Sequence, residues 1–242
     1  MGLNVMMGVP LVPGAIFSAV VAIALFINKE AGKAMDMFTK VLGVIMLCMV
    51  AFMMVKTQPP VALALKETVL PSTIDWMTIL TLVGGTVGGY ITFAGAHRII
   101  DAQITGVGNL ERISHGSVTA VCITGVMRYM LFLAILGVVV TGVKLDPTNP
   151  PASAFFYGAG ELGYKVFGVI LWCAAVTSVV GASYTSISFL RTLFSQVENF
   201  NRYWIIGFIC VSTAIFSTLG NPVRLLIFAG SLNGLILPIS LA

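Results

Sequence analysis

The residues best suited to chemistry lie in one apolar stretch that runs from Val83 to Arg98. It is dense in glycine, carries hydroxyl side chains near its middle, and ends in a histidine and an arginine. A membrane helix normally satisfies its backbone amides internally, so an unwound turn at membrane depth is tolerated only beside a buried or water-filled site. Secondary transporters bind their substrates at such turns. The stretch therefore predicts a broken membrane helix with a binding site at the break.

The composition is typical of a membrane protein. Hydrophobic residues make up 58% of the chain and charged residues only 9%, whereas ordinary globular chains carry about 25% charged residues. The net charge of +4 comes from short clusters between apolar runs, which orient membrane segments, and no basic tract with interleaved aromatics indicates nucleic-acid binding. We expect a multi-pass protein of the plasma membrane that has the lipid bilayer, and no nucleic acid, as a partner.

The helices that position the stretch follow from the lengths of the apolar runs, since a bilayer crossing needs about 20 mainly apolar residues. The runs predict one all-α transmembrane domain, residues 1–242, with about seven helices, one of them broken. Before the third, Ser72 to Asp75 resembles a helix N-cap with an acidic first turn. The predicted helices are 9–27, 36–56, 74–104 (broken), 116–143, 163–192, 203–219 and 223–242.

The remaining patterns indicate no enzyme. No catalytic Ser-His-Asp, HExxH, Walker or dinucleotide motif is present, and the few charged residues form no paired-carboxylate site. The methionines of the first two segments lie at near-helical spacing, which fits flexible packing rather than a soft-metal site. The cysteines lie inside apolar runs without paired spacing, so we expect buried small hydrophobes and no disulfide or metal ligand. They are Cys48, Cys122, Cys173 and Cys210.

Three segments resemble the natural resistance-associated macrophage protein (Nramp) family of divalent metal transporters. The opening from Gly2 to Gly14 resembles the start of the family's fourth membrane helix, and the next predicted helix, from Lys33 to Asp36 onward, looks like its fifth. The glycine cluster from Thr86 to Gly89 looks like the entry to the unwound centre of the sixth. The resemblance implies that the chain comprises helices four to ten of a LeuT-type fold, which consists of two inverted five-helix repeats. It also implies transport by alternating access.

The sequence departs from the family's pattern at the unwound centre of the sixth helix. The family's methionine-proline-histidine-asparagine element is replaced by Thr92-Phe93-Ala94-Gly95 in the ungapped alignment. Sulfur ligands favour transition metals, while hydroxyl, carbonyl and water oxygens suit Mg²⁺. The chain thus looks more like the Nramp-related magnesium transporters, with Mg²⁺ favoured over Mn²⁺ and Fe²⁺ as transported ion and no resident cofactor.

On this resemblance, the ion ligands are the carbonyl of Gly89, the hydroxyls of Tyr90 and Thr92, and a carbonyl at Phe93 or Ala94. A divalent ion at the bilayer midplane needs compensating negative charge. The family supplies it from its first helix, so we expect the N-terminal helices of a full-length parent as partners and no transport by this chain alone. The alternative function is a truncated, non-transporting membrane remnant or scaffold subunit.

Other polar groups at membrane depth have two interpretations each. His97 and Arg98 form a proton or polar path, or are solvated beside a cytoplasmic loop. Arg128 needs a partner or a path to water at its depth, unless its stem reaches the interface. Asn233 contacts a hydrated ion, as the tenth helix of the family approaches the site, or is a polar packing residue. The hydroxyl-rich run 177–188 lines the ion path or packs helices closely.

Overall fold

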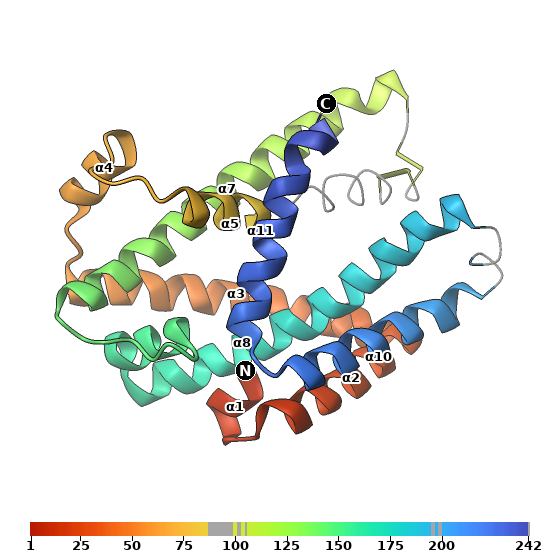
Figure 1. The fold of residues 1–242 in the computed structure, drawn as a ribbon, viewed down its shortest axis with the longest axis horizontal. Coiled ribbons are helices and arrows are strands. Elements are labelled where there is room, and N and C mark those ends of the chain that lie inside the picture. The colour runs from red at the N-terminus through yellow and green to blue at the C-terminus, as the bar shows by residue number, and fades with distance from the viewer. Residues whose placement is uncertain (87–98, 101–102, 105, 195–196, 198–199, 242) are drawn as a thin grey trace. The chain divides into compact units, whose positions relative to one another are not determined.

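The computed structural model describes residues 1–86, 99–100, 103–104, 106–194, 197 and 200–241 (Figure 1). Helices are the regular elements of this part of the chain, as predicted for an all-α protein. They are α1 (Gly2–Met7), α2 (Leu11–Ile27), α3 (Lys29–Thr57), α4 (Val61–Val69), α5 (Trp76–Thr86), η1 (Val107–Asn109), α7 (Leu110–Val140), α8 (Pro150–Leu193), α10 (Asn201–Leu219) and α11 (Pro222–Leu241).

Among the described residues, four helices are long and apolar enough to cross a membrane, and three shorter apolar helices accompany them. Each of the seven predicted segments overlaps one of these helices. The long ones are Lys33–Thr57, Val107–Val140, Pro150–Arg191 and Asn201–Leu219. The shorter ones are Leu11–Ile27, Trp76–Thr86 and Pro222–Pro238.

Several helix bounds differ from the prediction. The predicted 36–56 belongs to α3, which begins at Lys29, and the predicted 116–143 belongs to α7, Leu110–Val140. The predicted 163–192 lies within α8, whose helical path is interrupted at Gly160 (φ 75, ψ −169), a conformation that suits glycine. The short helices α1 and α4 were missed because neither is long enough to cross a bilayer. Of the predicted broken helix 74–104, residues 87–98 lie outside the described residues.

The contacts divide the chain into two compact units. The first comprises Met1–Gly14, Leu25–Ser72 and Glu111–Thr177. The second comprises Ala15–Ala24, Thr73–Leu110 and Ser178–Ala242.

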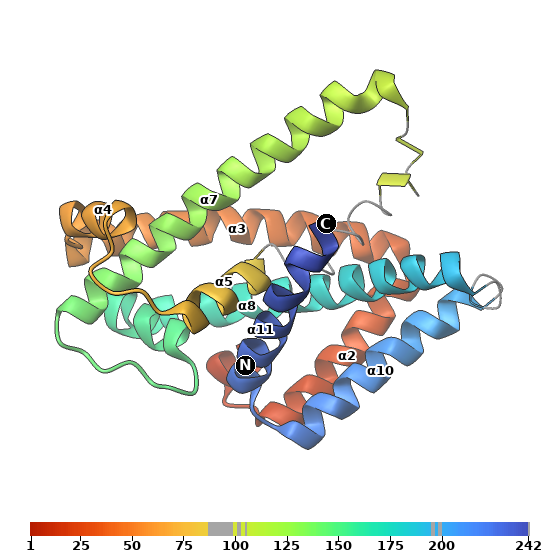
Figure 2. The same cartoon turned by 45° about the horizontal axis from the view of Figure 1, so that its top comes forward.

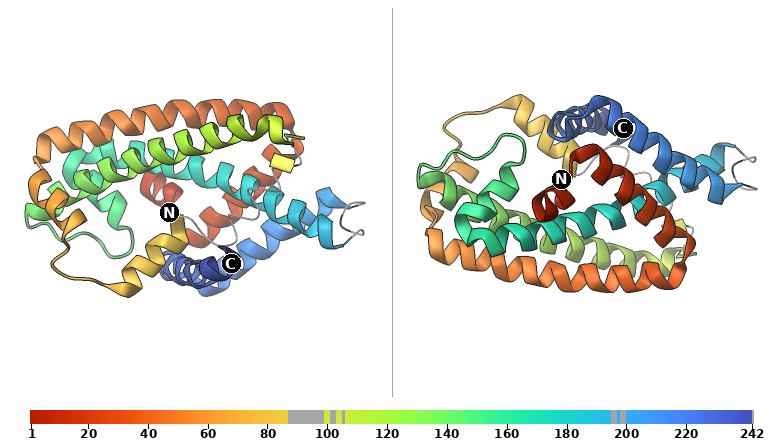
Figure 3. Two further views of the ribbon diagram at one scale, coloured as in Figure 1. Left: turned by 90° about the horizontal axis from the view of Figure 1, so that it is seen from above. Right: turned by 90° about the horizontal axis from the view of Figure 1, so that it is seen from below.

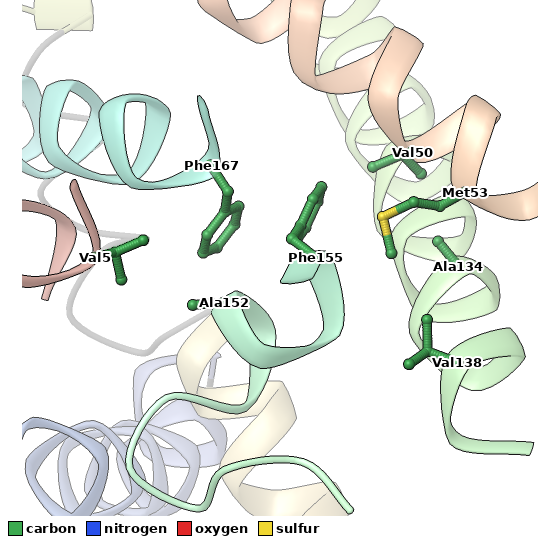
Figure 4. Close-up of a cluster of buried hydrophobic side chains, with 8 residues drawn as sticks. All are labelled: Val5, Val50, Met53, Ala134, Val138, Ala152, Phe155 and Phe167. Atoms are coloured by element: carbon green, nitrogen blue, oxygen red, sulfur yellow. The ribbon is translucent and has the colours of Figure 1, made fainter. Parts of the chain in front are cut away.

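The core of the first unit brings together side chains from α1, α3, α7 and α8. Phe155 and Phe167 stack with ring centroids 4.4 Å apart, and the fully buried Met53 points from α3 toward Phe155 (Figure 4). Other methionines of α3 pack against this cluster, so the packing role predicted for them is confirmed. The cluster comprises Val5, Val50, Met53, Ala134, Val138, Ala152, Phe155 and Phe167.

The cysteines correct one expectation. All four are free, but only Cys173 is buried, while Cys48, Cys122 and Cys210 are exposed on helix surfaces. The prediction that all four are buried was wrong, because apolar residues cover lipid-facing and protein-facing sides of a membrane helix alike. Hydrophobic sequence context therefore identifies membrane depth without identifying the packed face.

Candidate functional site

Seven of the predicted site residues lie outside the described residues, and their roles remain predictions. They are Gly89, Tyr90, Thr92, Phe93, Ala94, His97 and Arg98. The structure describes the two others, Asn233 on α11 and Arg128 on α7. It also describes α5, the helix that leads into the predicted break and forms the entry to the candidate site.

Helix α5 starts at a capped residue. The Asp75 carboxylate accepts hydrogen bonds from the backbone amides of Met77 (3.0 Å) and Thr78 (3.2 Å) and from the Thr78 hydroxyl (2.7 Å). The bonds from Thr78 are the main reason that the pKa of Asp75 is below its usual value of 3.8. The predicted N-cap before the third segment is therefore Asp75 itself, and its charge is favourable beside the helix N-terminus.

Helices α5 and α11 pack through glycines, with their backbones in direct contact (Figure 3). A Cβ atom on Gly84 would lie 2.8 Å from the Gly234 Cα atom and would overlap the Gly230 carbonyl oxygen. A Cβ atom on Gly230 would lie 2.8 Å from the Thr81 carbonyl oxygen. Small residues four apart let membrane helices approach this closely. The Gly230-xxx-Gly234 spacing was the sequence signal for this contact, and the prediction missed it.

A hydrogen bond joins the two helices next to these glycines. The hydroxyl oxygens of Thr81 and Ser231 are 2.9 Å apart. Thr81 also lies 2.8 Å from the Met77 carbonyl oxygen, and Ser231 lies 2.9 Å from the Ile227 carbonyl oxygen. Each hydroxyl has one proton, so two protons serve three contacts, and one of the two hydroxyls donates across the crossing at a time.

This crossing fixes the chain just before the predicted ion ligands. Gly84 precedes Gly89 by only five residues in the sequence. Asn233 is half-buried and lies on the α11 turn between Gly230 and Gly234. The structure thus brings Asn233 onto the segment of α11 that packs against the entry helix, while Arg128 lies in the other unit.

The hydroxyl-rich second half of α8 bonds to its own backbone. Ser183 donates to the Val179 carbonyl at 2.7 Å, and Thr185 donates to the Gly181 carbonyl at 2.8 Å. Ser183 is buried. Hydroxyls that bond back to the preceding turn need no other partner in an apolar environment, which favours the packing interpretation of the run 177–188.

Among the described residues, no group of three or more His, Cys, Asp or Glu side chains could hold a metal ion. The Tyr129 hydroxyl on α7 is buried and has no hydrogen-bond partner there. Its neighbour Arg128 is exposed.

Two curated proteins are similar to this chain. An uncharacterized membrane protein of Bacillus subtilis, YcsG, is 52% identical over 241 residues, which cover 100% of this chain and 60% of that protein. An uncharacterized membrane protein of Haemophilus influenzae is 50% identical over 242 residues, or 100% of this chain and 61% of that protein. The chain thus spans about three fifths of their length. No solved structure matches it.

The sequence matches the natural resistance-associated macrophage protein-like family over residues 1–242. The match covers the whole chain, including all three segments that carry the resemblance. Members of the family have the LeuT-type fold, with which the all-helical architecture agrees. The chain therefore belongs to the Nramp family.

Proposed function

We propose that the full-length protein containing this chain carries a divalent metal cation across the plasma membrane by alternating access, with Mg²⁺ favoured over Mn²⁺ and Fe²⁺. Membership of a transporter family supports a transport function over an enzymatic one. The proposal concerns the full-length protein because the chain spans only about three fifths of the length of its curated relatives.

The observation that carries the proposal is the backbone contact between α5 and α11. An ion site built from carbonyls needs a fixed backbone, since the ligands cannot adjust as long side chains do. Gly84 packs on the backbone of Gly230 and Gly234, and the Thr81–Ser231 hydrogen bond adds a polar link. Gly84 and Thr81 both lie on α5, the helix that enters the glycine-rich segment. Their contacts support the proposal that this segment is held in place to bind the ion.

The chemistry of that segment supports Mg²⁺ as the transported ion. Gly89, Tyr90, Thr92 and Ala94 offer carbonyl and hydroxyl oxygens and no sulfur. Mg²⁺ prefers oxygen ligands and keeps several waters, whereas thioethers favour softer metals. Asn233 of α11 adds an amide oxygen that can contact a hydrated ion. The cation is the substrate in this account, and no resident cofactor takes part.

Two parts of the proposal concern charge. His97 and Arg98 follow the ion ligands and supply a proton or polar path. A divalent cation at membrane depth needs negative charge. Membrane helices of the full-length protein outside this chain supply it in this proposal, with the bilayer as the surrounding partner.

Metal binding by the full-length protein tests the site. Titration calorimetry of the purified protein should show tighter binding of Mg²⁺ than of Mn²⁺. Thr92→Ala should weaken Mg²⁺ binding about fivefold, which corresponds to the loss of one hydrogen bond or ligand contact of about 1 kcal/mol. Thr218→Ala is the matched control, because Thr218 on α10 is exposed and bonds only to the Ile215 carbonyl at 2.9 Å.

Two results would reject parts of this proposal. Strong, selective Mn²⁺ binding would overturn the preference for a hard ion. Unchanged Mg²⁺ affinity in Thr92→Ala would remove Thr92 from the site. If the full-length protein binds no divalent cation at all, the scaffold function replaces transport.

A further inference from the structure

Arg128 lies at the centre of a long apolar helix. Between Gly116 and Val140, α7 contains Arg128 as its one charged residue. At 1.5 Å per residue, Arg128 is about 18 Å from Gly116 and about 18 Å from Val140. Because the hydrocarbon core is about 30 Å thick, a bilayer centred on this apolar run places the Arg128 backbone near mid-depth, where reaching either interface is hardest.

The face of α7 that carries Arg128 points away from the core of its own unit. Phe132 and Val139, four and eleven residues further on, share this face and are 51% and 44% exposed. Ala134 and Val138 lie on the other side of the helix and are 0% and 2% exposed. The side of α7 opposite Arg128 therefore already packs within the unit.

The face continues as a polar stripe toward the start of α7. Ser117 and Thr124 precede Arg128 by eleven and four residues, with Val121 between them, so all four share one side of the helix. Every residue from Ser114 to Arg128 is exposed, and this half of α7 diverges from α3 (Figure 2). The hydroxyl of Thr124 bonds back to the Ala120 carbonyl at 2.7 Å.

Arg128 forms no ion pair with the residues that the structure describes. The acidic residue on the neighbouring apolar helix α8, Glu161, is already bonded to Lys165 at 2.8 Å. An unpaired charge facing hydrocarbon at mid-depth is costly, and such residues almost always face the protein interior or a water-filled cavity and pair with an opposite charge.

We infer that the α7 face of Ser117, Val121, Thr124 and Arg128 packs against an apolar membrane helix that carries an Asp or Glu at mid-depth. That helix belongs to the part of the full-length protein outside this chain. The two curated relatives contain about two fifths of their length beyond the matched region, which is room for several helices. Charge complementarity selects a carboxylate, and the small hydroxyl residues allow close approach. This pairing does not depend on the proposed transport.

Photo-crosslinking in the native membrane tests the pairing directly. A benzoylphenylalanine replaces Val121, which is 72% exposed on the inferred face, in the full-length protein. The expected product is an internal crosslink to an apolar peptide outside these 242 residues that contains Asp or Glu, identified by mass spectrometry. The control places the same group at Val126, which is 61% exposed on the opposite side of α7 and should not give this product. Crosslinks from position 121 only to lipid, to a second copy or to this chain would overturn the inference.

Thermal unfolding gives an independent test, because the Arg128→Leu variant should lower the Tm if Arg128 is paired and leave it equal or higher if Arg128 faces lipid. If Arg128 pairs with a carboxylate, Arg128→Leu leaves that acid uncompensated and lowers the Tm by several degrees, while Arg128→Lys keeps most of the stability. Neutralising the crosslinked acid to its amide should restore the Tm of Arg128→Leu. Arg112→Leu, near the exposed start of α7, is the control and should leave the Tm unchanged. A Tm that stays equal or rises in Arg128→Leu would show that Arg128 faces lipid and contradict the pairing.

Discussion

Thr81 and Ser231 lie 150 residues apart in the sequence, and their hydroxyl oxygens are 2.9 Å apart across the contact of α5 with α11. Hydrogen bonds of this kind between membrane helices contribute about 0.6 kcal/mol on average and up to about 1.7 kcal/mol. The bond therefore supplements a contact whose close approach depends on the adjacent glycines, Gly84, Gly230 and Gly234.

A double-mutant cycle should measure this bond. In the full-length protein, Thr81→Val and Ser231→Ala should each lower the free energy of unfolding, and the double variant should lose less than the sum by about 0.6 kcal/mol. Unfolding in mixed detergent micelles gives the three values. The control cycle pairs Thr81→Val with Ser212→Ala, whose hydroxyl bonds only to the Phe208 carbonyl at 2.8 Å. Equal additivity in both cycles would show that the α5–α11 bond contributes nothing.

A methyl group on Gly84 should disrupt the crossing. Its Cβ atom would meet the backbone of Gly230 and Gly234, which cannot move aside as a flexible side chain can. We expect Gly84→Ala to lower the free energy of unfolding by about 3 kcal/mol, at the upper end for overpacked sites. Differential unfolding of the full-length protein in detergent measures it.

The neighbouring glycine provides the matched control for this variant. A Cβ atom on Gly85 would meet nothing within 4 Å, and alanine favours the helix over glycine by about 1 kcal/mol. Gly85→Ala should therefore leave stability unchanged or raise it. Similar losses in the two variants would contradict a specific backbone contact at Gly84.

The cap of α5 should make stability depend on pH. Hydrogen bonds, chiefly from Thr78, hold the pKa of Asp75 below 3.8 in the folded protein. A carboxyl whose pKa is lower when folded stabilises the protein above its unfolded pKa, and this contribution is lost as the pH falls through the folded pKa. The Tm of the full-length protein should thus fall further below pH 3.8 than the Tm of Asp75→Asn, whose amide can still cap the helix. Parallel Tm curves for the two proteins would be inconsistent with this role.

Removing the buried Tyr129 hydroxyl should not harm the protein. A buried polar group without a partner costs about 1 to 3 kcal/mol, and the Tyr129 hydroxyl has none among the described residues. Tyr129→Phe should raise the free energy of unfolding by about 1 kcal/mol. Tyr157→Phe, at a residue that is 51% exposed, should change it little. A clear loss of stability in Tyr129→Phe would reveal a partner for the hydroxyl outside the described residues.

The sequence predicted the fold class well because apolar length carries most of the information about a membrane helix. It did not predict which faces pack. Cys48 and Cys173 lie in equally apolar runs, yet only Cys173 is buried. The Gly230-xxx-Gly234 spacing signals a close helix contact, but it does not identify Gly84 as the partner, because the two segments lie far apart in the chain.

Local backbone conformation also escaped prediction. Gly160 interrupts α8 with a positive φ, but glycine is common within membrane helices and does not by itself signal a break. For the candidate ion site, the glycine pattern from Thr86 to Gly89 and the family resemblance indicated the segment. The α11 contact that anchors the helix before it required the structure.

Uptake of Mg²⁺ into proteoliposomes tests the central claim most directly. The full-length protein, reconstituted with a Mg²⁺-sensitive dye inside the vesicles, should show Mg²⁺ uptake well above that of empty liposomes, and excess Mn²⁺ should inhibit it only weakly. Vesicles with the 242-residue chain alone should behave like empty ones. No Mg²⁺ uptake by the full-length protein, or uptake of Mn²⁺ in preference to Mg²⁺, would contradict the account.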